Sequence, residues 1–179
     1  KFYIVGHVDD VVEEYDLSTA WDITTSTYNQ NFSVATQEGL PVGLFFKPDG
    51  TKMYVSGMFG DDVNEYNLTT AWDISTASYN QNFSVASQTG GPEGLHFKSD
   101  GTIMFVAGPD SSNNITVFEY GLTTAWDIST ASLSDSENIA RDGSGLSYGG
   151  LFFKTDGTKF FITSDVFDRV VQYDLSTAY

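Results

Sequence analysis

The chain has no cysteine among its 179 residues, and this absence removes several kinds of chemistry at once. Disulfide bonds, thiolate zinc sites, iron–sulfur clusters and cysteine nucleophiles are excluded, because each needs the sulfur of that side chain. Long apolar stretches are also missing, and no run approaches the roughly 20 residues that a membrane-spanning helix needs. The sequence therefore predicts no transmembrane segment.

Basic residues are scarce as well. Lysine and arginine total 8 against 24 aspartates and glutamates, so the formal net charge is −16. Such a surface repels phosphate groups, and we therefore expect no nucleic-acid partner and no charge-driven docking on anionic lipid. Apolar residues, in contrast, make up 40% of the chain and aromatic residues 15%. This is enough apolar bulk for a folded core and excludes a disordered tail.

The chain is built on an internal repeat of 51 to 56 residues. One block ends in a tryptophan: EEYDLSTAWDI at 13–23, NEYNLTTAWDI at 64–74, FEYGLTTAWDI at 118–128 and, shortened, VQYDLSTAY at 171–179. A second block contains an Asp-Gly turn: GLFFKPDGTKMYV at 43–55, GLHFKSDGTIMFV at 94–106 and LFFKTDGTKFFI at 151–162. A period of this length is typical of a propeller blade or an array.

Within one repeat the pattern is that of four short strands. We expect them at 43–47, 52–56, 62–68 and 82–86, joined by turns rich in Gly, Asp, Ser and Asn. The TAWDIST stretch between the last two predicts a single helical turn capped by Ser18 or Thr19 in its first copy. Four antiparallel strands in about 50 residues form a propeller blade. The predicted fold is therefore an all-β β-propeller of four-stranded antiparallel blades.

The repeats divide the chain into one predicted domain, 1–179, with repeats at approximately 1–42, 43–93, 94–149 and 150–179. Lys1 aligns with Lys52, so the first repeat is expected to lack its first strand and the last repeat its fourth. This gives three and a half to four blades. The sequence opens with Lys1 rather than Met, so we expect a processed chain or a fragment. Because open strand edges are aggregation liabilities, we expect either a fragment or a homo-oligomer in which a second copy completes the ring.

The string GLFFKPDGTKMYV, followed by DVNEYNLTTAWDIST, resembles a repeat of β-propeller proteins from marine bacteria, marine phages and ocean metagenomes. It is also distantly similar to the YVTN and NHL propeller repeats. The resemblance covers essentially the whole chain and implies the propeller fold. It implies no single activity, because propellers serve as scaffolds, lectins, adhesins, lactonases and hydrolases alike.

The repeated tryptophans have a structural and a functional interpretation. Trp21, Trp72 and Trp126 recur in every full copy of their block. A residue repeated in each blade usually serves the blade, so we expect each indole to be buried as a wedge between neighbouring blades. Stacking on a ligand is the alternative.

Paired aspartates are the candidate metal ligands. Asp9, Asp10, Asp61 and Asp62 lie in predicted turns between the second and third strands of their repeats. Calcium takes several oxygen ligands, and such pairs could contribute. None of these turns matches a known calcium-loop pattern, and solvated turn acids are the alternative. We expect no cofactor, with calcium as the one candidate.

His96 occupies a position held by Phe45 and Phe152 in the other repeats, on a strand expected to line the central channel. Propeller enzymes place metal ligands there, so His96 is the candidate residue for a metal-assisted, lactonase-like hydrolase. A half-buried histidine without a ligand is the alternative. The predicted inner strands carry no carboxylate, which counts against the lactonase mechanism.

Six of the eight basic residues belong to the repeat, and they flank the Asp-Gly turns: Lys1, Lys47, Lys52, Lys98, Lys154 and Lys159. Local charge pairing across the hairpin formed by the first two strands is the simpler interpretation. A cationic ring for an anionic ligand is the alternative.

The repeat is least regular at 109–114 and at 133–148, and loops on a rigid scaffold often carry binding sites. The candidate binding residues are Asp110, Asn113, Arg141, Asp142, Tyr148 and His96. We expect a non-catalytic binding or structural module, outside the cell or on a virion, with a glycan or a protein as partner. The alternative is the metal-assisted hydrolase with its site in the central channel.

Overall fold

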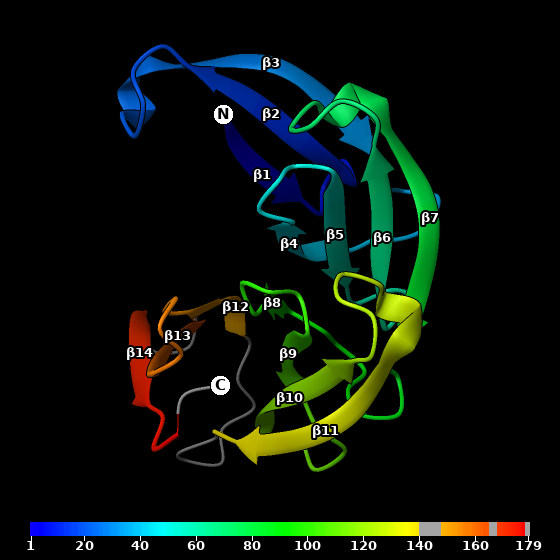
Figure 1. Cartoon of the computed structure of the whole chain (residues 1–179), viewed down its shortest axis with the longest axis vertical. Helices are drawn as coiled ribbons and strands as arrows, with labels where there is room; N and C mark the ends of the chain where they lie inside the picture. Colours follow the sequence, from blue (N-terminus) through cyan, green and yellow to red (C-terminus); the bar gives the residue numbers. More distant parts are fainter. Residues whose placement is uncertain (140–147, 165–167, 178–179) are drawn as a thin grey trace.

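The computed structural model describes residues 1–139, 148–164 and 168–177 and shows an all-β chain (Figure 1). The described residues form fourteen strands in four antiparallel sheets, which we number 1 to 4 along the chain. Their helical structure is limited to three short 3₁₀ turns. No helix in these residues is long and apolar enough to cross a membrane.

Each sheet takes its strands in chain order. Sheet 1 contains β1 (Phe2–Gly6), β2 (Val11–Leu17) and β3 (Ser26–Ser33). Sheet 2 contains β4 (Pro41–Phe46), β5 (Lys52–Gly57), β6 (Asp62–Leu68) and β7 (Ala77–Ser84). Sheet 3 contains β8 (Gly94–Phe97), β9 (Ile103–Pro109), β10 (Ile115–Leu122) and β11 (Ala131–Asn138). Sheet 4 contains β12 (Tyr148–Phe153), β13 (Lys159–Ser164) and β14 (Arg169–Asp174).

The expected strands agree with the structure except for the last strand of each repeat. It was expected at 82–86, but β7 runs from Ala77 to Ser84 and pairs along the whole of β6. A register shift between Glu65 and Tyr66 leaves Asn80 as an extra residue in β7. This β-bulge breaks the alternation of side chains. Apolar and polar residues alternate regularly only after the bulge. The strand predicted from that alternation was therefore too short and began too far along the chain.

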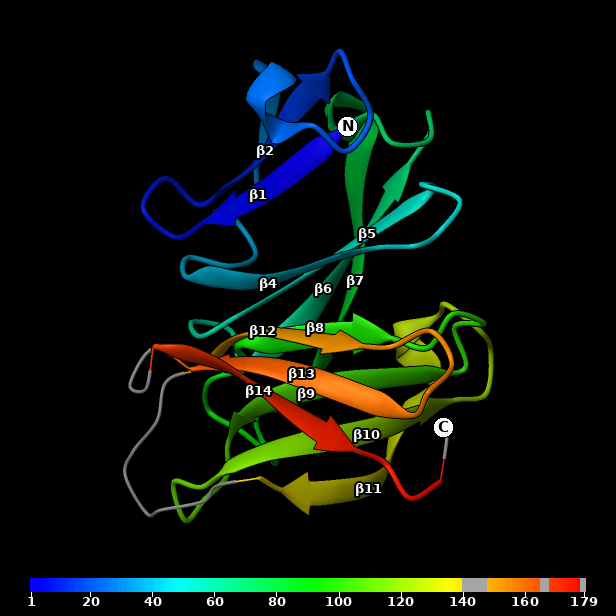
Figure 2. The same cartoon turned by 90° about the vertical axis from the view of Figure 1, so that its left-hand side faces the viewer.

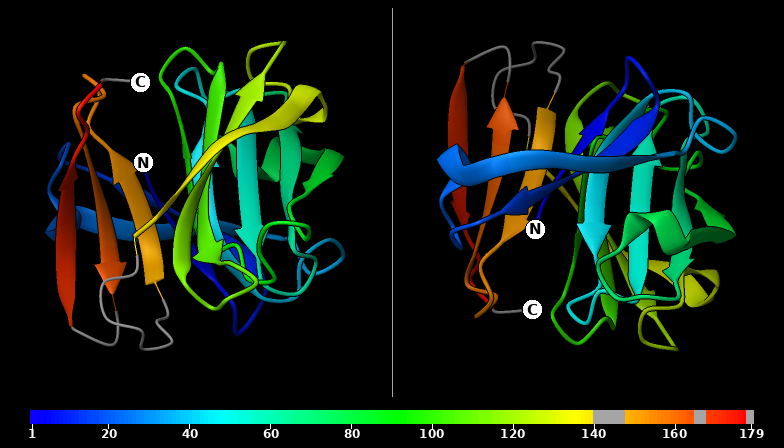
Figure 3. Two further views of the ribbon diagram at one scale, coloured as in Figure 1. Left: turned by 90° about the horizontal axis from the view of Figure 1, so that it is seen from below. Right: turned by 90° about the horizontal axis from the view of Figure 1, so that it is seen from above.

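The four sheets follow one another around an arc (Figure 1). The strand β4 lies against β1, β8 and β12, so the first strands of the sheets converge. Figure 2 shows the twist of the strands, and Figure 3 shows sheet 4 at one side of the molecule. Neighbouring sheets therefore meet face to face along the arc.

The hydrophobic core lies at the junctions between sheets. At the first junction, Val12 and Val34 of the first repeat are buried with Met53 and Tyr66 of sheet 2. Two further clusters join sheet 2 to sheet 3 and sheet 3 to sheet 4. Burial stabilises by roughly 25 cal/mol per Å² of apolar surface, so these junctions hold the arc together.

Three 3₁₀ turns connect the last two strands of sheets 1 to 3: η1 (Ile23–Thr25), η2 (Ile74–Thr76) and η3 (Ile128–Thr130). Their N-caps are aspartates, and Asp22 accepts a hydrogen bond from the backbone N–H of Thr24. The expected cap at Ser18 or Thr19 is wrong, because the turn begins later and its first free N–H groups lie beside Asp22.

Candidate functional site between sheets 3 and 4

A buried carboxylate ties sheet 1 to sheet 2. Glu14 is fully buried and accepts hydrogen bonds from the side chains of Lys1, Asn29 and Gln30. It also accepts one from the backbone N–H of Ile74, at 3.2 Å. Burial alone would raise the pKa of Glu14, but these hydrogen bonds, that from Lys1 first, outweigh burial and lower the pKa. The ionised carboxylate therefore holds η2 of sheet 2 against sheet 1.

The next junction repeats this arrangement. Glu65 of sheet 2 is fully buried and accepts from Lys52, from Asn80 at 2.8 Å and from Gln81 at 3.1 Å. The backbone N–H of Ile128 in η3 donates to it at 3.4 Å. The same chemistry thus holds two consecutive junctions.

An isoleucine of the 3₁₀ turn fills the apolar space at each of these junctions. Ile74 is fully buried in the cluster that contains Val12, Val34, Met53 and Tyr66. Ile128 is fully buried in the corresponding cluster at the second junction. Each turn therefore places an aliphatic side chain in the apolar space between two sheets, which we call the seat of that side chain. The backbone N–H of the same residue donates to a buried carboxylate.

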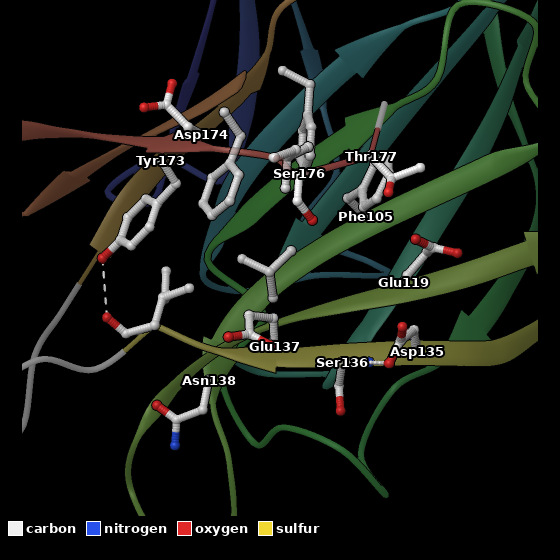
Figure 4. A pocket seen from close by; sticks show the side chains of 15 residues that line it. Phe105, Glu119, Asp135, Ser136, Glu137, Asn138, Tyr173, Asp174, Ser176 and Thr177 are labelled. Atoms are coloured by element: carbon white, nitrogen blue, oxygen red, sulfur yellow. Dashed lines mark hydrogen bonds between the residues drawn. The ribbon is translucent and has the colours of Figure 1, made fainter. Parts of the chain in front are cut away.

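At the third junction the same seat is a cavity of about 750 Å³ (Figure 4). We call it the junction cavity. Its apolar lining matches the seat of Ile74 position by position: Val117, Ile139, Phe160 and Tyr173 correspond to Val12, Val34, Met53 and Tyr66. The copy of the repeat that corresponds to this junction, VQYDLSTAY at 171–179, stops before the residues that form the 3₁₀ turn in the other copies.

The polar lining of the junction cavity differs from that of the other two junctions. Glu119 occupies the position of Glu65, and the strand register places Asp135 where Gln81 lies. Ser134 replaces Asn80 in the same register, and Ser134 Oγ donates to Glu119 Oε1 at 2.8 Å.

Two further replacements make this junction more acidic. Ile103 stands at the position of Lys52, the cation that pairs with Glu65. Glu137 stands at the position of the aromatic Phe83. The lysine and both amide donors of the repeat are therefore replaced, and two carboxylates are added. A ligand that brings hydrogen-bond donors or positive charge fits this lining.

Figure 4 shows how the cavity is arranged. Tyr173 lies near one end and donates from its hydroxyl to the backbone carbonyl of Ile139 at 3.0 Å, while Glu119 and Asp135 lie toward the other end. Asp174, at the Tyr173 end, pairs with Lys159, and this pairing lowers the pKa of Asp174. The cavity therefore has an apolar floor and an acidic end.

The tryptophans occupy two different environments. Trp72 packs on Gly50 and lies 5.6 Å from Phe46 and 6.5 Å from Tyr3 of sheet 1, between ring centroids. It therefore lies at the junction of sheets 1 and 2, although its side chain remains partly exposed rather than buried as expected. Trp21 is 98% exposed, because sheet 1 has no counterpart of β4 among the described residues.

Trp126 takes the same position between sheets 2 and 3. It packs on Gly101, with ring centroids 5.6 Å from Phe97 and 6.3 Å from Phe45 of sheet 2. Its backbone carbonyl accepts a hydrogen bond from the Tyr54 hydroxyl at 2.7 Å. A side chain on Gly101 would collide with the indole, which explains the glycine in the Asp-Gly turn.

His96 lies among phenyl rings. Its ring centroid is 5.3 Å from that of Phe45 and 5.5 Å from those of Phe152 and Phe153. Burial lowers the pKa of His96 to about 4. The described residues contain no group of three or more His, Cys, Asp or Glu side chains arranged to hold a metal ion. These surroundings favour a neutral, packed imidazole.

Asp9, Asp10 and Asp61 lie in the turns where they were expected, whereas Asp62 is the first residue of β6 and is paired with Gly57 and Ser84. Asp10 and Asp61 adopt left-handed backbone conformations, with φ of 52° and 48°. Asp62 is buried and accepts from the amides of Asn64 and Asn82, at 2.6 and 2.5 Å. Burial raises the pKa of Asp62. Asp9 is exposed. The calcium hypothesis for these residues stays a prediction.

The candidate binding loops are described only in part. Asp110 accepts from the backbone N–H groups of Ser112 and Asn114, at 2.8 and 2.9 Å, and so caps its own turn. Asn113 adopts a left-handed conformation in that turn. Arg141 and Asp142 lie outside the described residues, and Tyr148 begins β12.

The repeated lysines are paired locally, as the simpler interpretation predicted. Lys47, Lys98 and Lys154 each pair with the aspartate two residues later, within the turn. The other three do not pair across the first hairpin as expected. They reach the third strand of the repeat, in the pairs Lys1–Glu14, Lys52–Glu65 and Lys159–Asp174. Because each of the six lysines is paired with an acid, these pairs do not support the hypothesis of a cationic ring.

Sequence reasoning did not find the junction cavity, although its signal was present. The segment ASLSDSEN of β11 replaces ASYNQNFS of β7 and brings in Asp135 and Glu137. We attributed this departure to a loop, but it changes the strand that lines the cavity. Aligning the repeats by strand register identifies the replaced positions.

Comparison with known proteins supports the fold. No protein-family model matches the chain, and no curated protein matches it. Among solved structures, a "putative 6-phosphogluconolactonase" from Bacteroides uniformis is similar, with a TM-score of 0.61 and 11% identity over 96% of this chain and 46% of its own.

Two further solved structures are also similar to this chain. A protein from Lactobacillus plantarum has a TM-score of 0.62 and 14% identity over 99% of this chain and 51% of its own. The Cps50 (Swd1) β-propeller domain from Myceliophteria thermophila has a TM-score of 0.55 and 9% identity over 93% of this chain and 51% of its own. The chain spans about half the length of these structures, and the expected β-propeller fold is confirmed.

Proposed function

We propose that the chain is a non-catalytic binding module that recognises a protein partner through the junction cavity. One observation carries this proposal: between sheets 3 and 4 the lysine and both amide donors that surround the buried carboxylate of the second junction are replaced, and Asp135 and Glu137 add two carboxylates beside an apolar floor. Its volume of about 750 Å³ lies in the range of roughly 300–1,000 Å³ that is usual for ligand sites.

A protein partner suits this cavity better than a glycan. The floor is formed by buried apolar side chains, among them Phe105, Val117 and Phe160. Sugar hydroxyls placed there would lose water without gaining hydrogen-bond partners, which is unfavourable. An aliphatic side chain would fill the same space without that penalty. The exposed acidity of the chain agrees with a site of action outside the cell or on a virion, which we propose as its location.

The test is to probe a peptide array and a glycan array with the purified chain and with the variant Glu119→Gln. We expect binding to a subset of peptides and loss of that binding in the variant, with circular dichroism showing that the variant is folded. Binding to glycans alone, or peptide binding that the substitution leaves unchanged, would contradict the proposal.

The catalytic alternative receives less support. His96 was its candidate residue, and phenyl rings surround its imidazole. The similarity to a lactonase-like structure is at 11% identity and concerns the fold alone. A metal-dependent hydrolase would gain thermal stability from Zn²⁺ or Ca²⁺, so a melting temperature that does not change with these ions favours the binding module.

A further inference from the structure

We propose that the turn between β5 and β6 carries a second docking surface, which binds an apolar pocket bordered by lysine or arginine on another protein. We call it the turn surface and define it by Leu40, Met58 and Phe59. It shares no residue with the lining of the junction cavity, so this inference goes beyond the proposed function. Sheet 2, which carries the turn, has a neighbouring sheet on both sides, so the exposure of the turn does not arise from a missing neighbour.

The turn surface exposes large apolar side chains in one place. Phe59 is 77% exposed, Met58 43% and Leu40 39%. The backbone N–H of Met58 donates to the carbonyl of Leu40 at 3.1 Å, which keeps the two segments together. Met58 also approaches Pro109 of sheet 3, because a side chain on Gly91 would contact both. Adjacent exposed apolar side chains are typical of protein interaction sites.

A buried carboxylate fixes the conformation of the turn. Glu38 is fully buried and accepts hydrogen bonds from three backbone N–H groups. Leu40 donates at 2.8 Å, Phe59 at 3.0 Å and Gly60 at 3.2 Å. Hydrogen bonds to a charged acceptor are strong, so Glu38 holds both segments of the turn surface in place. The exposed ring is therefore pre-organised, which reduces the entropy lost on binding.

The corresponding turns of sheets 1 and 3 are built differently. In sheet 1 the strand register places Val8 at the position of Phe59. In the third repeat Thr89 takes the position of Glu38 and accepts from the N–H of Gly91 at 3.2 Å. The turn that follows β9 is longer and is capped by Asp110. Among these three turns, an aromatic tip and a buried carboxylate that supports it therefore occur together in sheet 2 alone.

The charges around the turn surface favour a basic partner. Glu38 accepts from the turn, and Asp61 and Asp62 follow it directly in the chain. The basic residues within 1–139 all lie near the opposite end of the strands, beside the Asp-Gly turns or their counterpart: Lys1, Lys47, Lys52 and Lys98. Lysine or arginine on the partner offsets the negative charge, whereas a second copy of this chain would add like charge.

A protein suits this surface better than a glycan. Met58 and Leu40 lie beside the aromatic tip, and their side chains offer no hydrogen-bond partner to sugar hydroxyls. An apolar pocket on a protein would bury all three side chains without that loss. Phe59, as the most exposed of them, is the residue that we expect to contribute most to affinity.

Selection from a phage-displayed library of random peptides tests the inference. The library is first depleted on the variant Phe59→Ser, which has the same net charge, and is then selected on the unaltered chain. We expect the enriched peptides to combine lysine or arginine with leucine, phenylalanine or tryptophan. Enrichment of peptides without basic residues, or no enrichment at all, would overturn the inference.

Fluorescence polarisation with the most enriched peptide then locates its site. We expect Phe59→Ser to weaken binding at least about tenfold. Asp61→Asn should weaken it about threefold, and asparagine tolerates the left-handed conformation of that residue, with φ of 48°. Val8→Ser is the matched control, because Val8 is 83% exposed in the corresponding turn, and it should leave the affinity unchanged. Circular dichroism verifies that each variant is folded.

The variant Glu119→Gln separates the turn surface from the junction cavity, and it should leave the affinity of the selected peptide unchanged. A selected peptide that depends on Glu119 but not on Phe59 would support the proposed function and overturn this inference. The same result is reached if Val8→Ser weakens binding as much as Phe59→Ser does. Binding to a glycan array that Phe59→Ser abolishes, without any enriched peptide, would assign the turn surface to sugars instead.

Discussion

At the scale of single residues, the three tryptophans share a left-handed backbone with φ of 65° but differ in packing. We predict that Trp21→Asn leaves the free energy of unfolding unchanged or raises it by up to about 1 kcal/mol. The indole of Trp21 is 98% exposed, and asparagine tolerates this conformation better than tryptophan. Urea denaturation measures the change.

The matched substitution Trp126→Asn should lower the free energy of unfolding by about 2–3 kcal/mol. Asparagine is introduced into the same left-handed backbone conformation as at position 21, so the backbone effect is matched. At position 126, however, the substitution also removes the contacts with Gly101 and Phe97. Equal effects at the two positions would show that the packing of Trp126 between sheets 2 and 3 does not stabilise the fold.

His96 should make the fold sensitive to acid. Burial lowers its pKa to about 4 in the folded chain, from 6.5 when unfolded. The unfolded state therefore binds the proton first, and stability that is full above pH 6.5 decreases as the pH falls toward 4. The loss amounts to about 2–3 kcal/mol.

We predict that His96→Phe, which restores the residue of the other repeats, removes most of this decrease between pH 6.5 and 4. Urea denaturation across that range measures it. His7 is exposed, so His7→Gln is the control and should leave the profile unchanged. A profile that is the same in His96→Phe as in the unaltered chain would assign the acid sensitivity to carboxylates.

At the scale of elements, the buried carboxylates should differ in their contribution to stability. We predict that Glu65→Ala lowers the free energy of unfolding by about 3 kcal/mol, because it leaves Lys52, two amides and a backbone N–H without their acceptor. Glu119→Ala, at the same strand position, should lower it by less than about 1 kcal/mol. Chemical denaturation of both variants measures the difference, and equal losses would contradict the assignment of Glu119 to a ligand.

The strands could be predicted from the sequence because alternation and Asp-Gly turns are local signals. The position of β7 could not, because the bulge at Asn80 depends on its pairing with β6. The candidate site required still more distant information. Asp135 becomes informative only when the register places it opposite Glu119 and the sheets bring both near Tyr173. A pattern read along the chain contains none of these contacts.

At the scale of the whole molecule, the described part of the arc has two outer sheets with three strands each. Completion of the ring by a second copy stays a prediction. Sedimentation velocity measures it directly, because a dimer is expected if two copies join through sheets 1 and 4. A compact monomer across the concentration range would contradict it.

The net charge should make the fold more stable at higher salt. All six lysines are already paired with nearby acids, so most of the charge of −16 belongs to carboxylates that repel one another. Added salt shortens the screening length from roughly 30 Å at 0.01 M to 10 Å at 0.1 M and so reduces this repulsion. It also weakens the exposed ion pairs, but each contributes only about 0–1 kcal/mol.

We therefore predict that the melting temperature rises by several degrees between 0.01 and 0.5 M sodium chloride. A rise of this size corresponds to a gain of about 1 kcal/mol in the free energy of unfolding. Choline chloride at equal ionic strength should produce a similar rise if screening is the cause, whereas sucrose at equal osmolality controls for exclusion from the surface. A melting temperature that falls with salt would mean that the lysine pairs, rather than the excess of carboxylates, dominate the electrostatic free energy of the fold.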